Sequence, residues 1–292
     1  MANTFLVIGG DLRQIYLASM LSKSYNVRLL GFTKNLTDDA DIEIFENQTE
    51  QLTPADYAVL PIPASSDGVT IACPFVGKNI MLDTLPTLVK EGGVVFGGKI
   101  DETLKNFCAQ NGFEAVDYLE REELSVANAV PTAEGALQTA MEELPVTISG
   151  SKVLVIGFGR IGKVLTKMFR DLGANVTVST GSYEKIQWIK IYGAEPVNTS
   201  KIDNRLGEYD LIINTAPSVV LDKNRLAKIS DATLIIDLAS KPGGVDFESA
   251  KMLGKKTIWA LSLPGKVAPK SSGEIIAQTI LNILEERGEE CG

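Results

Sequence analysis

A glycine-rich passage from strand to helix stands in the middle of this chain. The segment Val153–Lys163 reads VLVIGFGRIGK, so a buried β-run passes through Gly157, Gly159 and Gly162 into an amphipathic helix. In a dinucleotide-binding fold these glycines allow a tight turn, a close approach of backbone to pyrophosphate, and close packing of helix on strand. Because such a fold begins with this strand, the residues before Ser149 must form a separate unit.

The composition narrows the class of protein. The length of 292 residues suits two domains, and 45% hydrophobic with 22% charged residues is ordinary for a soluble globular protein. No apolar run is long enough to span a bilayer, and the N-terminus lacks an export signal, so we expect a cytoplasmic protein. The net charge is −9 without a basic block, which argues against nucleic acid as a partner.

The chain contains no histidine, and this excludes several chemistries. A histidine base, a Ser-His-Asp triad and a histidine-ligated metal are impossible, which argues against an ordinary hydroxyacid dehydrogenase. The three cysteines, Cys73, Cys108 and Cys291, are an odd number at unrelated spacings, so we expect free thiols and no metal site.

Strand-like runs alternate with helical patterns in both halves, which predicts α/β architecture with parallel sheets. We expect two doubly wound, Rossmann-like domains with a ligand cleft between them. The first is a flavodoxin-like substrate domain of about five strands, residues 1–130, on which a C-terminal helix over residues 273–292 packs back. The second is a cofactor domain, residues 131–272. In the first half, helices are predicted over residues 11–22, 80–88 and 101–110. A bridging helix is predicted over residues 133–144, with Thr132 as its N-cap and Pro145 ending it.

The predicted cofactor site follows from the glycine turn, namely Gly157, Phe158, Gly159, Arg160, Ile161 and Gly162. The next strand ends without the acid that holds the ribose of NAD, so NADP is favoured and NAD stays open. Hydroxyls and a lysine at that end are the candidates for the 2′-phosphate: Ser179, Thr180, Ser182 and Lys185. Two later loops are expected to border the nicotinamide, with simple turns as the alternative: Thr215, Ala216 and Pro217, and Leu238 and Ala239.

Cations in glycine-rich or proline-rich segments are candidates for binding an anion. Arg13 follows Gly9-Gly10-Asp11 at a strand-to-helix turn that resembles a phosphate loop without its third glycine. The alternative is that Asp11 caps the helix and Arg13 is a surface cation. Lys266 and Lys270 lie in a predicted Pro/Gly loop over residues 263–273, which a merely solvated loop explains as well.

Six strings together resemble the family of dipicolinate synthase A subunits, from about residue 5 to about residue 285. They are GGDLRQ from Gly9, PTAEG from Pro131, the glycine turn, NTAPS from Asn214, DLASKPGG from Asp237 and LPGKVAPK from Leu263. The resemblance implies NAD(P)-linked oxidation of a dihydrodipicolinate-type precursor to dipicolinate, in the mother cell of a spore-forming bacterium, with a flavoprotein-like B subunit as partner. Gly181 departs from the arginine expected there, which weakens the preference for NADP.

The resemblance also suggests roles for individual residues. The dianionic substrate would be held by Arg13, Thr132, Lys241, Lys266 and Lys270. Glu134 is the first candidate for a catalytic base and Asp246 the second, although helix capping explains Glu134 equally well. We expect a homo-oligomer. Two other functions stay open: a cofactor-binding regulatory or scaffold subunit, and a dehydrogenase of another small acid.

Overall fold

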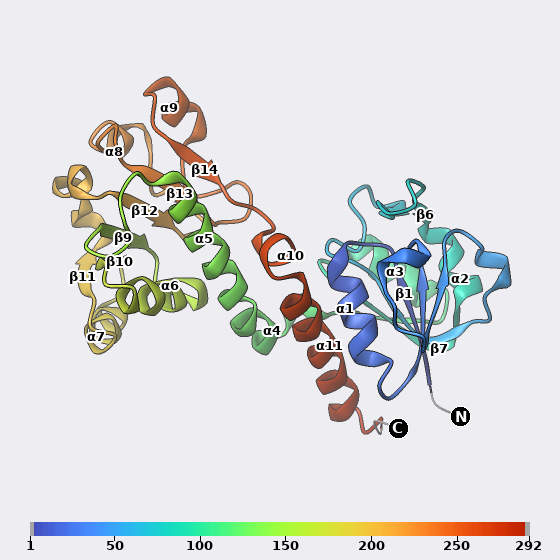
Figure 1. Ribbon diagram of the computed structural model, residues 1–292. Helices are drawn as coiled ribbons and strands as arrows, with labels where there is room; N and C mark the ends of the chain where they lie inside the picture. Colours follow the sequence, from blue (N-terminus) through green and yellow to red (C-terminus); the bar gives the residue numbers. More distant parts are fainter. Residues whose placement is uncertain (1–2, 290–292) are drawn as a thin grey trace. The chain divides into compact units, whose positions relative to one another are not determined.

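The computed structural model describes residues 3–289, and the chain divides into two compact units (Figure 1). The first unit runs to Asn128 and also includes the segment from Ala268 onward, whereas the second unit consists of Ala129–Val267. Each unit is built on a six-stranded parallel sheet covered by helices on both faces. The prediction of two doubly wound α/β domains is therefore confirmed.

The sheet of the first unit has the strand order β3-β2-β1-β4-β7-β8. Its order reverses between β1 and β4, which makes the carboxyl ends of these two strands the switch point of a doubly wound sheet. A short antiparallel pair, β5 with β6, lies outside the main sheet. The strands are β1 (Thr4–Ile8), β2 (Asn26–Leu30), β3 (Ile42–Phe45), β4 (Ala55–Val59), β5 (Thr70–Ile71), β6 (Ile80–Met81), β7 (Val89–Gly97) and β8 (Glu114–Asp117).

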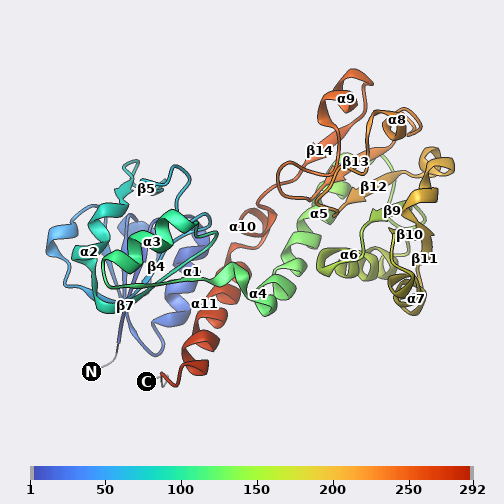
Figure 2. The ribbon, with the colours of Figure 1, turned by 180° about the vertical axis from the view of Figure 1, so that it is seen from behind.

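Two helical layers bury the alternating faces of this sheet. Phe5 and Val7 of β1 face the core beneath α1, α4 and α11, whereas Leu6 and Ile8 face the core beneath α2 and α3. Figures 1 and 2 show α11 running beside α1, so the C-terminal helix packs on the first unit as expected. The helices are α1 (Leu12–Leu21), α2 (Leu85–Leu88), α3 (Glu102–Gln110), α4 (Glu122–Ala127) and α11 (Pro269–Glu286), with short 3-10 turns at Lys34–Leu36, Thr49–Gln51, Leu82–Thr84 and Tyr118–Glu120.

Two predictions for the first unit were wrong. The sheet has six strands rather than about five, because β3 at its edge is only four residues long and carries too short a pattern to stand out. The helix expected over residues 80–88 is instead β6, a 3-10 turn and the short α2. Pro86 explains this, since proline is tolerated only in the first turn of a helix and so α2 begins at Leu85.

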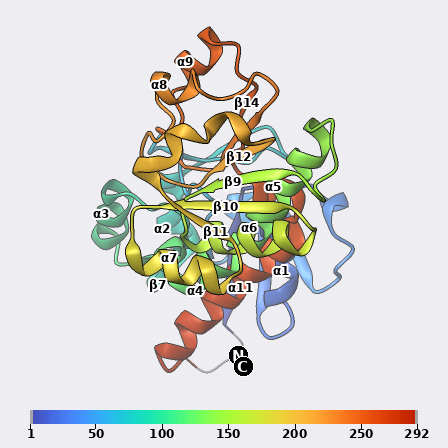
Figure 3. The ribbon, with the colours of Figure 1, turned by 90° about the vertical axis from the view of Figure 1, so that its left-hand side faces the viewer.

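The second unit repeats the architecture, with strand order β11-β10-β9-β12-β13-β14 and a switch point between β9 and β12. Figure 3 shows β9, β10 and β12 of this sheet. The elements are β9 (Lys152–Ile156), β10 (Asn175–Thr180), β11 (Glu195–Asn198), β12 (Leu211–Asn214), β13 (Leu234–Asp237) and β14 (Thr257–Trp259), with α5 (Ala129–Glu143), α6 (Arg160–Asp171), α7 (Tyr183–Ile191), α8 (Lys223–Leu226), α9 (Phe247–Met252) and α10 (Leu263–Val267), and 3-10 turns at Thr199–Asn204 and Leu206–Glu208.

The two faces of this sheet are again covered by different helices. Val153 and Val155 of β9 pack beneath α5, α6, α7 and α10, while Leu154 and Ile156 pack beneath α8, α9 and the 3-10 turns. Helix α5 approaches α10 closely, because a Cβ built on Gly135 would lie 2.9 Å from Cβ of Leu263. Glycine at this position therefore sets the spacing between the two helices.

One prediction for the second unit needs correction, and one strand was not predicted. Strand β11 does not stand out in the sequence because it is a short edge strand that contains Pro196. Helix α5 begins at Ala129, so Thr132 lies within its first turn and is not its N-cap. This helix, over which the bridging segment was predicted, lies within the second unit and packs in its core.

The loop expected over residues 263–273 is also wrong, because these residues are mostly helical. Helix α10 occupies Leu263–Val267, and α11 begins at Pro269. Proline with its fixed φ suits the first turn of a helix, and both Pro264 and Pro269 stand in that position. Lys266 therefore lies on α10 and Lys270 on the first turn of α11.

The remaining structural expectations concern cysteines, metals and membranes. Cys73 and Cys108 are buried free thiols, and Cys291 lies outside the described residues. Within residues 3–289 no group of three or more acidic, cysteine or histidine side chains could hold a metal ion. In the same range, none of the helices is both long enough and apolar enough to cross a membrane.

Candidate functional site

The glycine turn joins β9 to α6 at the switch point of the second sheet. Gly157 has φ +97°, a conformation that favours glycine, and a Cβ on it would lie 2.5 Å from Oγ1 of Thr215. A Cβ on Gly162 would overlap the carbonyl of Gly157, so α6 can pack on this turn only with glycine there. A Cβ on Gly159 would have no neighbour within 4 Å. The first and third glycines are thus needed for packing, and the second leaves the helix N-terminus accessible to a phosphate.

Thr215 holds the next loop against this turn. Its backbone N–H and its hydroxyl both donate to the carbonyl of Ile156, at 2.9 Å each. Because Ile156 is the last residue of β9, the loop after β12 is tied to the base of the glycine turn. Two of the predicted nicotinamide contacts, Thr215 and Ala216, therefore lie beside Gly157, whereas Pro217 is exposed farther along the loop.

A buried amide–carboxylate pair connects the loops after β12 and β13. Asn214 donates through Nδ2 to Oδ1 of Asp237 at 2.8 Å and to the carbonyl of Ala216 at 2.9 Å. Asp237 also accepts from the backbone N–H of Ala239 at 3.0 Å and of Gly244 at 2.8 Å. Both side chains are fully buried. The pair fixes the shape of both loops, a role that the sequence motifs did not reveal.

The loop after β13 carries the other predicted nicotinamide contacts. Leu238 and Ala239 are buried, and the carbonyl of Ala239 accepts from Nε1 of Trp259 at 2.9 Å. Lys241 is exposed farther along the same loop. The structure therefore brings Thr215, Ala216, Leu238 and Ala239 together through the Asn214–Asp237 pair, and leaves Lys241 in solvent.

The end of β10 is where the ribose of a dinucleotide would lie. Ser179 is fully buried, and its hydroxyl lies 3.3 Å from that of Thr199, so it faces the protein interior. The hydroxyl of Thr180 accepts from the N–H of Ser182, and Ser182 caps α7 by accepting from the N–H of Lys185. Lys185 is exposed. Of the predicted phosphate contacts, Thr180, Ser182 and Lys185 lie at the turn itself.

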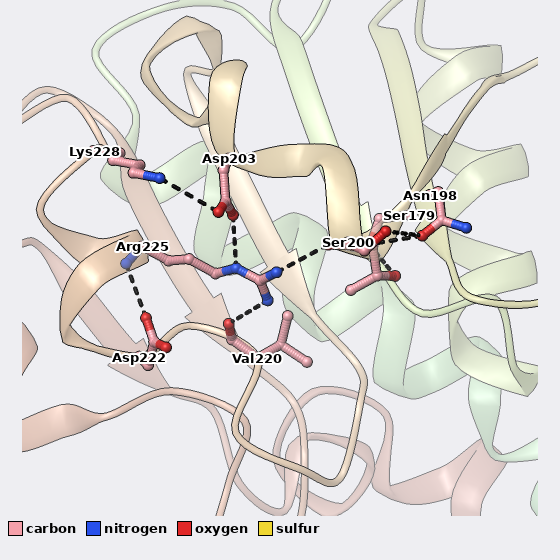
Figure 4. Close-up of polar contacts among 9 residues, drawn as sticks. Ser179, Asn198, Ser200, Asp203, Val220, Asp222, Arg225 and Lys228 are labelled. Carbon is pink, nitrogen blue, oxygen red and sulfur yellow. Dashed lines mark hydrogen bonds and ion pairs between the residues drawn. The ribbon is translucent and has the colours of Figure 1, made fainter.

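Arg225 on α8 fixes the segments that follow β11 and β12 (Figure 4). It donates to the carbonyl of Val220 at 2.9 Å and of Thr199 at 3.0 Å, and its Nε lies 2.8 Å from the carboxylate of Asp203. Lys228 reaches the other oxygen of that carboxylate. Arg225 thereby joins the segments that follow β11 and β12 at their carboxyl ends. No sequence pattern indicated this residue, because its partners are mostly backbone carbonyls.

In the first unit, the β1–α1 turn carries the other predicted anion-binding residue. Asp11 caps α1 by accepting from the N–H of Arg13 at 3.0 Å, which confirms its predicted capping role. The same carboxylate binds Nε of Arg13 at 2.9 Å and Nη2 at 2.8 Å. Arg13 is only 9% exposed, so the alternative of a free surface cation is wrong.

Comparisons with known proteins place the chain in a family. A family model of the N-terminal domain of the dipicolinate synthase A subunit matches residues 4–119, and one of the D-isomer specific 2-hydroxyacid dehydrogenase NAD binding domain matches residues 123–245. The A subunit of dipicolinate synthase from Bacillus subtilis (strain 168) is 34% identical over 295 residues, covering 98% of this chain and 97% of that protein. This chain belongs to the family of dipicolinate synthase A subunits.

Solved structures of the family agree with this assignment. The structure of the dipicolinate synthase A subunit from Bacillus halodurans has a TM-score of 0.88 at 32% identity and covers 97% of both chains. The dipicolinate synthase A chain from Bacillus subtilis has a TM-score of 0.87 at 32% identity, covering 99% of this chain and 98% of that one. The NAD-binding family model and the switch-point glycines together assign a nicotinamide cofactor and an oxidoreductase class to this family member.

The predicted catalytic residues of this dipicolinate synthase family member lie apart within the second unit. Glu134 is exposed on α5 and lines a groove with Leu137 of the same helix and Lys163 and Val164 of α6. Asp246 caps α9 by accepting from the N–H and the hydroxyl of Ser249. These hydrogen bonds hold the pKa of Asp246 below its ordinary value, which makes it a weak proton acceptor.

The other predicted substrate contacts are divided between the units. Thr132 lies on α5 and Lys266, exposed, on α10 of the second unit. Arg13 and the exposed Lys270 belong to the first unit. Their roles toward a substrate stay predictions.

Proposed function

We propose that this chain is the cofactor-binding, catalytic A subunit of a dipicolinate synthase. It oxidises a dihydrodipicolinate-type dicarboxylate to dipicolinate in the cytoplasm of a sporulating cell, together with a flavoprotein-like B subunit. The observation that carries the proposal is the match to the A subunit of a dipicolinate synthase over 98% of this chain. The accessible N-terminus of α6 at Gly159 supports the cofactor half of it.

The chemistry asks little of the protein beyond binding and orientation. NADP would supply the hydride acceptor and the substrate would also lose one proton, so that oxidation of the dihydropyridine dicarboxylate by NADP⁺ balances as dipicolinate, NADPH and H⁺. Formation of an aromatic ring favours the step. The glycine turn would hold the pyrophosphate, and the loops fixed by Asn214 and Asp237 would orient the nicotinamide ring.

Charge complementarity governs the substrate side of the proposal. A dianion bound to a protein of net charge −9 needs local cations, and we assign that role to Arg13, Lys241, Lys266 and Lys270 with the hydroxyl of Thr132. Glu134 remains our candidate for accepting the proton, since the carboxylate of Asp246 is already engaged in capping α9 through its hydrogen bonds with Ser249. We propose homo-oligomers of this chain within the complex.

Turnover of a freshly generated precursor tests the proposal. The purified chain with NADP should produce one NADPH for each dipicolinate formed, both alone and with the B subunit. A chain that binds NADPH, needs the B subunit to form dipicolinate and keeps that activity in Glu134→Gln would instead support a cofactor-binding scaffold role. Glu134→Gln should lower kcat about a hundredfold if Glu134 accepts the proton, with Glu142→Gln on the exposed face of α5 as the control.

We propose NADP rather than NAD, because no carboxylate stands at the end of β10 itself and the first one, Glu184, comes only in the following helix beside Lys185. Titration with NADPH and NADH should show at least tenfold tighter binding of NADPH, and equal or tighter binding of NADH would contradict the assignment. Gly181 offers a second test, since a Cβ there has no neighbour within 4 Å. Gly181→Arg should tighten NADPH binding selectively and Gly181→Asp should favour NADH, with Gly181→Ala as the control.

A further inference from the structure

The β1–α1 turn of the first unit has the same length as the glycine turn of the second and, like it, begins with a glycine at positive φ, Gly9 and Gly157 respectively. In each, three residues separate the last strand residue (Ile8 or Ile156) from the first helical residue (Leu12 or Arg160). Each turn also stands at the switch point of its sheet. Both positions are where a doubly wound sheet binds its ligand.

Two substitutions make the first turn unsuited to pyrophosphate. Asp11 takes the capping position that Gly159 holds in the second unit, so a carboxylate lies where phosphate would approach. Gln14 takes the position of Gly162, the glycine that lets the helix pack on its turn. The first turn therefore retains the location of a ligand site but changes the chemistry of the ligand.

Gln14 is the unusual member of this turn. Its side chain is fully buried, yet neither Nε2 nor Oε1 has a hydrogen-bond partner among residues 3–289. Buried polar groups are almost always satisfied, and an unsatisfied amide lowers the stability of the protein. Such a residue is expected where a ligand supplies the missing partners.

The surroundings place this amide directly over the turn. A Cβ on Gly10 would lie 2.9 Å from both Cδ and Oε1 of Gln14 and 2.8 Å from Cβ of Pro61, so only glycine leaves room for the amide. Pro61 follows β4, the strand across the switch point.

Arg13, the residue before Gln14, has hydrogen-bond donors that its partner Asp11 does not fully occupy. Asp11 binds its Nε and Nη2, whereas Nη1 has no hydrogen-bond partner within the described part of the chain. The Asp11 carboxylate offsets much of the guanidinium charge, so this turn favours a ligand that combines a carboxylate with a neutral or donor group. A bare phosphate would gain less.

We propose that the β1–α1 turn of the first unit binds a ring carboxylate together with the adjacent ring N–H, and that Gln14 recognises this pair. In the dihydro tautomer that carries hydrogen on the ring nitrogen, Nε2 of Gln14 donates to the carboxylate while Oε1 accepts from this N–H, whose proton is the one that oxidation releases. The ligand class rests on the proposed function. The aromatic product has a ring nitrogen without a hydrogen, so Oε1 loses its donor and the site prefers the reduced ring over the product.

Two stable probes separate these ligand classes. Piperidine-2,6-dicarboxylate carries ring N–H donors, and pyridine-2,6-dicarboxylate does not. Calorimetry on the full-length chain should show at least tenfold tighter binding of the piperidine compound. In Gln14→Leu and the less disruptive Gln14→Met, this ratio should fall below twofold. Their melting temperatures should be equal to or above that of the wild type, because an unsatisfied group has been removed.

Thr279→Val is the matched control, because Thr279 is equally buried in the same unit but its hydroxyl already donates to the carbonyl of Ile275. This variant should keep the tenfold ratio. Wild-type protein that binds neither probe, or Gln14 variants that keep the ratio, would overturn the inference. Turnover of the precursor with the B subunit is measured on the same preparations. If the preparations form dipicolinate but the affinity ratio of the two probes is the same in wild type and the Gln14 variants, the subsite alone is rejected. If the ratio depends on Gln14 but no dipicolinate is formed, the proposed function alone is rejected.

Discussion

Replacing Gly159 by alanine should separate cofactor binding from folding. Gly159 caps α6 with φ −89° and ψ −158°, angles that alanine adopts without strain. A Cβ there has no neighbour within 4 Å in the protein. If the pyrophosphate approaches the backbone at this point, the added methyl group meets the ligand and not the protein.

The expected change in stability is small because two effects oppose each other. Alanine is a poorer N-cap than glycine by about 0.5–1 kcal/mol. It also restricts the unfolded chain, which stabilises the protein by about 0.4–1 kcal/mol. The free energy of unfolding of Gly159→Ala should therefore stay within about 0.5 kcal/mol of wild type, whereas NADPH binding should weaken at least tenfold, or about 1.4 kcal/mol.

Gly162→Ala should behave in the opposite way. Its Cβ would overlap the carbonyl of Gly157, and the obstruction is backbone that cannot rotate aside. Overpacking of this kind costs about 1–3 kcal/mol, only partly offset by the better helix propensity of alanine, about 1 kcal/mol. We expect a net loss of up to about 2 kcal/mol, visible as a lower melting temperature.

Urea unfolding and fluorescence titration with NADPH on both variants decide the matter. The reasoning is refuted if Gly159→Ala binds NADPH as tightly as wild type, because the backbone at Gly159 would then not face the pyrophosphate. It is equally refuted if Gly159→Ala unfolds more easily than Gly162→Ala.

Three further predictions follow from the same contacts. Arg225→Met should weaken NADPH binding about tenfold, because it releases the segments that follow β11 and β12. Arg205→Met is the control, since it breaks a 2.7 Å ion pair with Glu195 at the amino-terminal end of β11 and should leave NADPH binding unchanged. Titration of both variants with NADPH measures the difference. Burial raises the pKa of the Cys73 and Cys108 thiols to about 11, so peptide mapping after iodoacetamide at pH 8 should find both unmodified in the folded chain. The hydrogen bond from Arg205 holds the pKa of Glu195 below its ordinary value. The contribution of the Glu195–Arg205 pair to the free energy of unfolding is therefore present above about pH 4.5 and is lost as the pH falls through the lowered pKa. Arg205→Met should flatten this acid limb of the melting temperature.

The sequence predicted those features that depend on local chemistry. The glycine turn was readable because Gly157, Gly159 and Gly162 each meet a requirement set within a few residues of themselves. The parallel sheets were readable because apolar runs alternate with helical patterns. Edge strands β3 and β11 escaped this reasoning, since each has four residues and one contains a proline.

Features that depend on strand register were beyond the sequence. Asn214 and Asp237 are 23 residues apart and meet only because β12 and β13 pair them side by side. Ser179 was predicted to contact a phosphate, yet it lies buried against Thr199, because β10 extends to Thr180 and so directs Ser179 inward. The partners of Arg225 are carbonyls of segments after β11 and β12, and a carbonyl carries no side-chain signal.

Both units place a strand–turn–helix of equal length at the switch point of a six-stranded sheet, yet two glycines of the second turn have no counterpart in the first. Where the second unit has Gly159 and Gly162, the first has Asp11 and Gln14. In place of these glycines the first unit has a negative charge at the helix N-terminus and, in the first turn of the helix, a buried amide without a hydrogen-bond partner among the described residues. The first change disfavours a polyphosphate and the second favours a small ligand with paired donor and acceptor groups. A strand–turn–helix of one length at the switch point thus accounts for the proposed cofactor site in one unit and for the proposed ring-carboxylate site in the other.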